Sequence, residues 1–262
     1  MNQMRKPAVA GSFYPAAPDA LRAAVADFLK GADTPDAPAP KAIIAPHAGY
    51  IYSGAVAASA YVRIAARASA IRRVVLLGPA HRVGFRGIAL PGVDAFETPL
   101  GSIPLDLDAI ALIEPLPQIV TRADAHAQEH SIEVHLPFLQ QLLGAFSLVP
   151  LVVGDAEPAE IEQVIELLWG AEETLIVVSS DLSHFQDYAT AQNMDRATSA
   201  AIEAMTPDEI GYDDACGRLP IAGLLRAASK HGLHAKTIDL RNSGDTAGPR
   251  DNVVGYGAYV IG

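Results

Sequence analysis

A continuous apolar run leads straight into polar residues in Thr174-Leu-Ile-Val-Val-Ser-Ser-Asp-Leu-Ser-His184. Strands that are buried on both faces have such unbroken runs, and they are typical of parallel sheets covered by helices. Three other segments have the same character: Lys41–Pro46, Arg73–Gly78 and Ser147–Gly154. We therefore predict four central strands in a mostly parallel sheet.

Longer segments with apolar residues at helical spacing and alanine-rich filling separate these strands. They are residues 16–31, 53–68, 126–144, 158–169 and 189–205. Alternation of this kind predicts an α/β fold with three layers, in which helices cover both faces of the sheet. We expect residues 1–262 to form a single domain, because α/β folds of this size often do.

The remaining segments complete the expected organisation. Residues 233–240 and 253–261 are predicted to be late strands, and residues 84–105 a small hairpin insertion. The proline-rich stretch 32–40 is typical of a short tether.

Composition limits the function classes. Nineteen Lys and Arg residues against thirty Asp and Glu give a formal charge of -11, which repels phosphate backbones and anionic lipid heads. The first residues have no apolar signal-peptide run, and no segment is long and apolar enough to span a bilayer. We therefore predict a cytoplasmic protein that binds neither nucleic acid nor membranes. We also expect it to use no nucleotide cofactor.

Histidines follow three of the predicted strands. His47 follows the first, His81 lies three residues beyond Gly78, and Asp181 and His184 follow the last. The carboxyl ends of parallel strands meet at the ligand crevice of an open α/β sheet. A single histidine at such a place is more often a structural residue bonded to a carbonyl group. Three together favour a shared site for metal ligation or proton transfer.

Cys216 is the only cysteine, so it forms no intramolecular disulfide. It precedes a predicted helix over 221–228, and a helix N-terminus with Arg218 nearby would favour the thiolate. The sulfur is then suited to be a metal ligand or a nucleophile. A small buried hydrophobic residue is the alternative.

The segment 126–144 resembles the zinc-protease helix only superficially. His130 and His135 are five residues apart rather than four, so they do not share a helix face. In a continuous helix, His126, His130 and Glu133 would share one face and orient ligands from behind, or simply face solvent. A Ser-His-Asp hydrolase is disfavoured, because no G-x-S-x-G motif is present.

Six segments together resemble the Memo family, whose prokaryotic members are called AmmeMemoRadiSam system protein B. The resemblance covers essentially the whole chain and rests on residues 10–15 (AGSFYP), 45–50 (APHAGY), 77–81 (LGPAH), 129–137 (EHSIEVHLP), 178–184 (VSSDLSH) and 216–221 (CGRLPI).

The resemblance implies a fold related to class III extradiol dioxygenases, which hold non-heme iron with two histidines and a carboxylate. By that likeness, His47, His81 and Cys216 are the metal ligands, and His184, supported by Asp181, is the acid/base. From their positions in the sequence rather than from the resemblance, we expect His130, Glu133 and Arg218 to surround these residues without binding the metal ion. The thiolate replaces the dioxygenase carboxylate, and sulfur favours copper(I), zinc or thiolate-bound iron.

Two classes of function follow from the sequence. In the first, the protein is an iron(II)- or copper-dependent redox enzyme of the dioxygenase type, with His184 moving a proton. In the second, it is a binding or adaptor protein for a peptide or a partner. The resemblance implies AMMECR-type and radical SAM proteins as such partners.

Overall fold

A large mixed sheet forms the centre of the computed structural model, which describes residues 3–33 and 38–262. Its strands lie in the order β10-β12-β2-β9-β3-β8-β4-β7, and β11 pairs with β12. The four predicted central strands are adjacent and parallel: β2 (Ala42–Ala45), β9 (Thr174–Ser179), β3 (Arg73–Pro79) and β8 (Ser147–Val153). Antiparallel strands extend the sheet on both sides of these four, so the sheet is mixed rather than mostly parallel.

The outer strands include pieces that the sequence predicted and pieces that it did not. The late strands are confirmed as β11 (Ala235–Asn242) and β12 (Val253–Ile261). At the other edge lie β4 (Ile88–Leu90) and β7 (Ile119–Thr121), whereas β10 (His184–Gln186) is a short strand beside β12. The insertion forms the hairpin β5 (Ala95–Thr98) and β6 (Gly101–Pro104), and β1 (Met4–Arg5) joins it in a second sheet.

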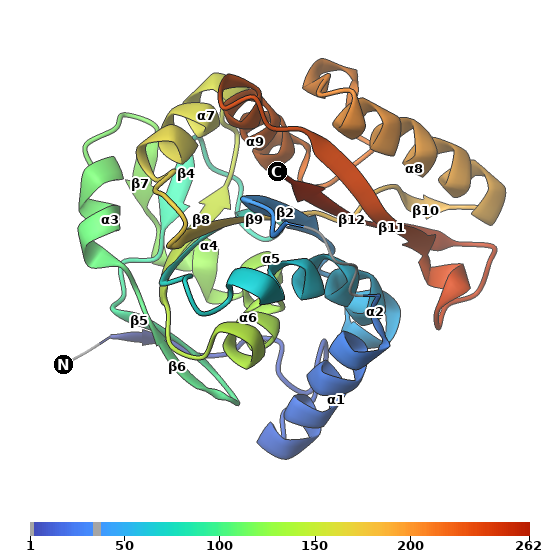
Figure 1. The fold of residues 1–262 in the computed structure, drawn as a ribbon, viewed down its shortest axis with the longest axis horizontal. Helices are drawn as coiled ribbons and strands as arrows, with labels where there is room; N and C mark the ends of the chain where they lie inside the picture. The colour runs from blue at the N-terminus through green and yellow to red at the C-terminus, as the bar shows by residue number, and fades with distance from the viewer. Residues whose placement is uncertain (1–2, 34–37) are drawn as a thin grey trace.

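Helices cover both faces of the large sheet (Figure 1). One face packs on α1 (Pro18–Gly31), α2 (Tyr50–Tyr61) and α6 (Leu136–Leu143). The other packs on α3 (Leu107–Ile113), α7 (Pro158–Leu167), α8 (Tyr188–Glu203) and α9 (Arg218–Lys230). Successive residues of β3 enter opposite cores, with Val74 and Leu76 on one side and Val75 and Leu77 on the other. The unbroken apolar runs therefore reflect burial on both faces.

The predicted helix over 126–144 is wrong in one respect, because the segment is broken into three pieces. These are α4 (Ala123–Ala127), α5 (His130–Glu133) and α6. The Glu129 side chain caps α5 by accepting a hydrogen bond from the Ser131 N–H, and Pro137 lies in the first turn of α6. Both features start new helices rather than continue an old one.

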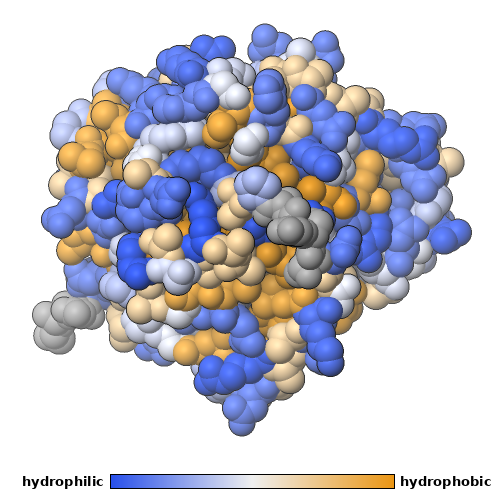
Figure 2. All heavy atoms as spheres, viewed as in Figure 1, coloured by the Kyte–Doolittle hydropathy of each residue, from blue (hydrophilic) through white to orange (hydrophobic). Residues whose placement is uncertain are grey.

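Short 3₁₀ helices complete the described structure at Val62–Arg67, Pro207–Glu209 and Ser243–Asp245. Apolar residues appear among polar ones on the face shown in Figure 2, and they gather below its centre, over α6. Within residues 3–33 and 38–262, no helix has the length and apolar character needed to cross a membrane. Part of the predicted tether, residues 34–37, lies outside the described residues.

Candidate metal centre

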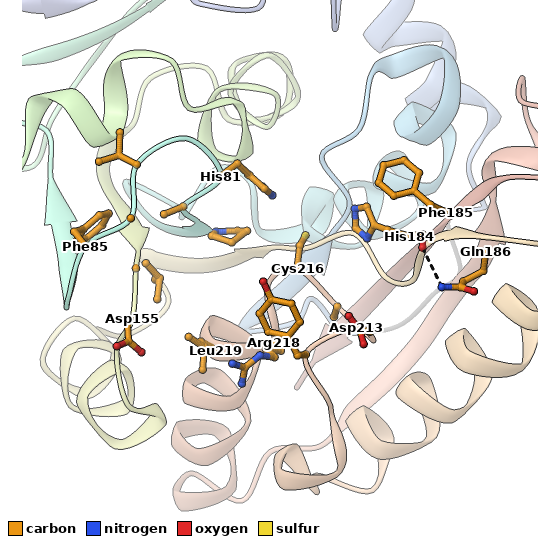
Figure 3. A pocket seen from close by; sticks show the side chains of 18 residues that line it. His81, Phe85, Asp155, His184, Phe185, Gln186, Asp213, Cys216, Arg218 and Leu219 are labelled. Carbon is orange, nitrogen blue, oxygen red and sulfur yellow. Dashed lines mark hydrogen bonds between the residues drawn. The ribbon is translucent and has the colours of Figure 1, made fainter.

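The carboxyl ends of the parallel strands bring three potential metal ligands together. His47 follows β2, His81 follows β3, and Cys216 immediately precedes Gly217, the N-cap of α9. One ligand atom from each of the three lies within 4.8 Å of the other two. Figure 3 shows His81 and Cys216 pointing into one cavity, with His184 beside them. The structure thus brings together the three residues that the family resemblance implies as metal ligands.

The hydrogen bonds of His47 fix its tautomer. Its Nδ1 lies 2.5 Å from Ser179 Oγ, and that hydroxyl donates its only proton to the Ser131 carbonyl at 2.7 Å. His47 Nδ1 must therefore be the donor, which leaves the lone pair on Nε2. Nε2 lies 3.5 Å from Cys216 Sγ. Burial, followed by the neighbouring histidines, lowers the pKa of His47, so the imidazole is neutral and suited to bind metal.

Glu129 orients His81 in the same way. Its carboxylate accepts hydrogen bonds from His81 Nδ1 at 2.9 Å and from the His81 backbone N–H at 2.7 Å. Burial alone would raise the pKa of Glu129, but the bonds and charge of His81 outweigh burial and lower the pKa to about 2. A carboxylate on Nδ1 leaves Nε2 as the ligand atom, as in carboxylate–histidine–metal triads.

Glu129 is the residue that sequence reasoning missed. The prediction assigned the supporting role to His126, His130 and Glu133, as one face of a continuous helix. The break before α5 separates these side chains: His126 Nε2 donates to the Ala89 carbonyl at 2.8 Å, and Glu133 binds the N-terminal segment. The order Glu129-His130-Ser131 gives no strong local sign of this break, because glutamate is not among the residues that favour the N-cap position.

His130 lies at the centre even though it is not among the three ligands. Its ring stacks on His81 at 4.6 Å between centroids and meets His47 edge-on at 5.3 Å. His130 Nδ1 is buried and has no hydrogen-bond partner among the described residues. His81, Glu129 and His130 form a second group that could hold a metal ion.

Cys216 and Asp181 are in direct contact. The Asp181 N–H points at Cys216 Sγ at 3.3 Å, and the Asp181 carboxylate accepts from the His47 backbone N–H at 2.8 Å. Burial, together with the charge of Asp181, raises the pKa of the Cys216 thiol above its ordinary range. These effects outweigh the expected help from the helix N-terminus. Arg218 lies over the ring of Tyr212, at 5.6 Å.

This protonated thiol argues against Cys216 as a free nucleophile, because the thiolate is the reactive form. Coordination to a metal ion deprotonates a thiol outright. A bound metal ion would therefore convert Cys216 to the thiolate, which the protein environment alone disfavours.

His184 stands between two cavities. One has a volume of about 580 Å³ and is also lined by His81, Cys216 and Arg218, and the other has about 360 Å³ and is also lined by His130 and Asp181. His184 Nδ1 donates to the Leu182 carbonyl at 2.7 Å, so Nε2 is again the free nitrogen. Asp181, the predicted support of His184, forms its hydrogen bond with His47 instead.

The chain bends sharply after His184. The pairing of β10 with β12 shifts register between His184 and Gln186, and Phe185 has φ 59°. A bulky residue in the left-handed region is unusual and costs free energy. The bulge leaves the Phe185 ring 73 % exposed beside the larger cavity.

Comparison with known proteins finds relatives over almost the whole chain. Residues 5–260 match the profile of the family described as Memo-like protein. The chain belongs to this family. Among its relatives is a MEMO1 family protein of Aquifex aeolicus, 35 % identical over 265 residues, with 97 % of each chain covered. Another, from Methanopyrus kandleri, is 34 % identical over 281 residues, with 98 % of each covered.

A third relative, from Thermoplasma acidophilum, is 35 % identical over 266 residues, with 98 % of each chain covered. Among solved structures, an uncharacterized protein from Escherichia coli K12 matches at a TM-score of 0.49 and 13 % identity, covering 84 % of this chain and 98 % of its own. The family match over residues 5–260 and the identity to the MEMO1 family relatives confirm the sequence resemblance to the Memo family.

The donor set of this Memo-like chain fits a soft or borderline metal ion. Two imidazoles that each present Nε2 and one sulfur suit copper(I), zinc or thiolate-bound iron. Asp181 Oδ2 lies 3.9 Å from His47 Nε2, so a carboxylate borders the ligand atoms as well. The arrangement can thus hold a metal ion and leave His184 free for proton transfer.

Gly217 sets the position of Cys216, and we expect Gly217→Ala to disturb the centre. A Cβ there would lie 2.6 Å from the Ser179 carbonyl oxygen and 2.6 Å from Ser180 Cβ, closer than packed atoms approach. Overpacking of this kind costs about 1–3 kcal/mol. Urea unfolding should show that loss, and zinc(II) titration a weaker site. Gly31→Ala, where nothing lies within 4 Å, is the control; equal behaviour of the two variants would contradict the expectation.

Proposed function

We propose that the protein is a metal-dependent redox enzyme in which His47, His81 and Cys216 hold iron(II) or copper. The observation that carries the proposal is the convergence of their three ligand atoms within 4.8 Å, with both imidazoles held as Nδ1–H tautomers. A histidine tautomer fixed by a partner on its other nitrogen is the usual design of metal ligands. When bound, the metal ion would supply electron transfer and Lewis acidity.

The chain's own residues would do the rest of the chemistry. The Nδ1–H of His184 is committed to the Leu182 carbonyl, so its Nε2 can accept a proton from a substrate and later return it. His184 borders both cavities, and a substrate in either one would therefore reach it. Asp181 holds the His47 backbone in place. A fold relationship to class III extradiol dioxygenases is part of this proposal.

A binding function is the second candidate, and the rim of the larger cavity favours it. Phe185 and Tyr212, which line this cavity, are 73 % and 82 % exposed. Exposed aromatic side chains beside a pocket are typical of recognition sites. In this alternative the protein binds a peptide or a partner, such as an AMMECR-type or radical SAM protein, and the centre performs no turnover.

Anaerobic metal titration tests the enzyme proposal. Wild-type protein should bind one equivalent of iron(II) or copper(I), and Cys216→Ser and His81→Ala should lose it. His231→Ala serves as the control, because that imidazole pairs with Glu166 and stacks on Trp169, away from the centre. Stoichiometric binding would justify an oxygen-consumption screen with catechol-like compounds. A wild-type protein that retains no iron, copper or zinc would refute the proposal and favour the binding function.

A further inference from the structure

A buried ion pair lies outside the metal centre and joins the N-terminal segment to α5. Arg5 Nη1 contacts Glu133 Oε2, and their side chains are 5 % and 0 % exposed. The Glu133 carboxylate also accepts hydrogen bonds from the backbone N–H groups of Ala8 and Val9 and from the Tyr14 hydroxyl. A buried carboxylate with this many donors is fully satisfied. Glu133 therefore fixes residues 5–14 against α5.

The other donors of Arg5 reach the break between α4 and α5. Arg5 Nε donates to the His126 carbonyl at 3.1 Å, and Arg5 Nη2 donates to the Glu129 carbonyl at 2.7 Å. Carbonyl groups at a helix end lack helical partners and need others when they are buried. The planar guanidinium thus contacts carbonyl groups on both sides of the break between α4 and α5, while its Nη1 is paired with Glu133.

This interruption is what aims Glu129 at His81. The Glu129 backbone is extended, with φ -82° and ψ 127°, and its side chain reaches His81 Nδ1 and the His81 N–H. A continuous helix through residue 129 would change these angles and turn the carboxylate elsewhere. The Arg5 contacts stabilise the extended conformation over the helical one.

We propose that Arg5 is a positioning residue of the metal centre, acting on His81 through the backbone and carboxylate of Glu129. The N-terminal segment then helps to form the metal centre, although β1 is far in the sequence from the three candidate ligands. The inference rests on the proposed metal function for its affinity readout, but the claim about the Glu129–His81 geometry stands without metal.

A second contact runs from the same segment to the same place. The Phe13 ring packs on His130 at 4.7 Å, and His130 in turn stacks on His81. Phe13 lies next to Tyr14, whose hydroxyl is bound by Glu133 at 2.5 Å. The N-terminal segment therefore also contacts the histidine cluster through Phe13, by a route that involves Glu133 but not the contacts of Arg5 with the backbone.

A double-mutant cycle tests the proposal, with zinc(II) as the probe and affinity measured by competition with a chromophoric chelator. Arg5→Gln and Glu129→Gln should each weaken zinc binding by about tenfold, the scale expected for groups that orient a ligand. Because Arg5 acts through Glu129, Arg5→Gln should add less than twofold in the Glu129→Gln background. The proposal would be overturned if the two substitutions weakened zinc binding independently, so that their fold-changes in Kd multiplied in the double variant. An unchanged Kd in folded Arg5→Gln protein would overturn it as well.

Two further variants separate positioning from stability. Arg5→Lys keeps the charge beside Glu133 but lacks the planar fork that reaches both carbonyls, so it should remain folded and still bind zinc more weakly. Arg73→Gln removes a guanidinium paired with Asp106 at 2.7 Å, away from the three ligands, and should lower the melting temperature without changing the Kd. If both variants change the Kd equally, Arg5 has only a structural role.

A metal-free readout distinguishes failure of this inference from failure of the proposed function. The Nδ1–H of His81, hydrogen-bonded to Glu129, should give a protected imidazole proton resonance in nitrogen-15 NMR of the wild-type apoprotein. Arg5→Lys should weaken or shift that resonance. An unchanged resonance refutes the positioning role even where zinc binds, whereas a changed resonance supports it even where no metal binds.

Discussion

The His47→Ala protein is expected to bind zinc(II) or iron(II) at least a hundredfold more weakly than the wild type, whereas Ser179→Ala loses about tenfold. Four-ligand zinc sites bind with about 10–16 kcal/mol, so one ligand contributes roughly 3 kcal/mol, or about a hundredfold. Ser179 is not a ligand but fixes the His47 tautomer through Nδ1 at 2.5 Å. Loss of such a partner costs about 10–100-fold in affinity.

The two variants together test the argument about the tautomer. In Ser179→Ala, the His47 Nδ1 proton loses its acceptor, so the proton can move to Nε2 and compete with the metal ion. Ser179→Cys should behave like Ser179→Ala, because a thiol is a weak acceptor. Chelator competition at pH 7.5 measures the zinc affinities of His47→Ala, Ser179→Ala and Ser179→Cys beside the wild type. The control is Ser147→Ala, a change at the first residue of β8, which is the end of that strand away from the metal centre. Equal affinities of Ser179→Ala and wild type would contradict the tautomer assignment.

The central strands and the positions of the two candidate histidine ligands could be predicted because their cause is local. The role of Cys216 as a third candidate ligand followed only from the family resemblance, since its position alone also fits a small buried hydrophobic residue. In an α/β fold, an apolar run that is buried on both faces forms a strand. The carboxyl end of that strand lies at the ligand crevice, and this placement does not depend on the conformation of the loops. His47, His81 and His184 each lie within five residues after such a run, so their convergence required mainly that the strands be neighbours. The order β2-β9-β3-β8 places them so.

The supporting residues could not be predicted for the opposite reason. Glu129 reaches His81 only because the helix breaks, and the break depends on Arg5, which is 124 residues away in sequence from Glu129. The hydrophobic periodicity of residues 126–144 predicts an apolar helix face, but it does not show where a turn interrupts the helix. The role of Asp181 was similarly hidden: the sequence places it beside His184, but the geometry turns its carboxylate to the His47 N–H. The antiparallel extension of the sheet also depends on pairings that sequence periodicity does not encode.

The apoprotein should lose several kcal/mol of stability as the pH falls from about 6.5 to about 4, because buried histidines are held neutral. Burial lowers the pKa of His126 to about 4 and that of His135 to about 3. In the unfolded chain both titrate near the ordinary value of about 6.5. Between these limits the unfolded state binds more protons than the folded state, so acid favours unfolding. Above about pH 6.5 the stability from both groups is fully present.

The magnitude is large enough to unfold the protein. Each pKa unit is worth about 1.4 kcal/mol, so the two histidines together contribute on the order of 5–8 kcal/mol at most, against a typical total of about 5–15 kcal/mol. Asp195 acts in the opposite direction, since burial raises its pKa to about 6 and its contribution grows in acid. Burial also raises the pKa of Asp181, which adds to this offset, whereas burial lowers the pKa of His130 to about 4, which adds to the loss. We expect an acid transition between about pH 4 and 5.5.

His135→Gln should shift that transition to lower pH and reduce its slope by up to one proton. The His135 ring is buried and its Nδ1 pairs with the Tyr61 hydroxyl at 2.8 Å, a contact that a glutamine amide can replace without taking up a proton. The measurement is urea unfolding of chelator-treated protein at pH 4.5, 5.5, 6.5 and 7.5, with His231→Gln as an exposed control. A His135→Gln stability that falls with pH as steeply as the wild type would mean that His135 is not the group held neutral. Because the ligand histidine His47 is also buried and neutral, the acid that unfolds the core is the same acid that would protonate the metal centre, and the fold and the site would fail together.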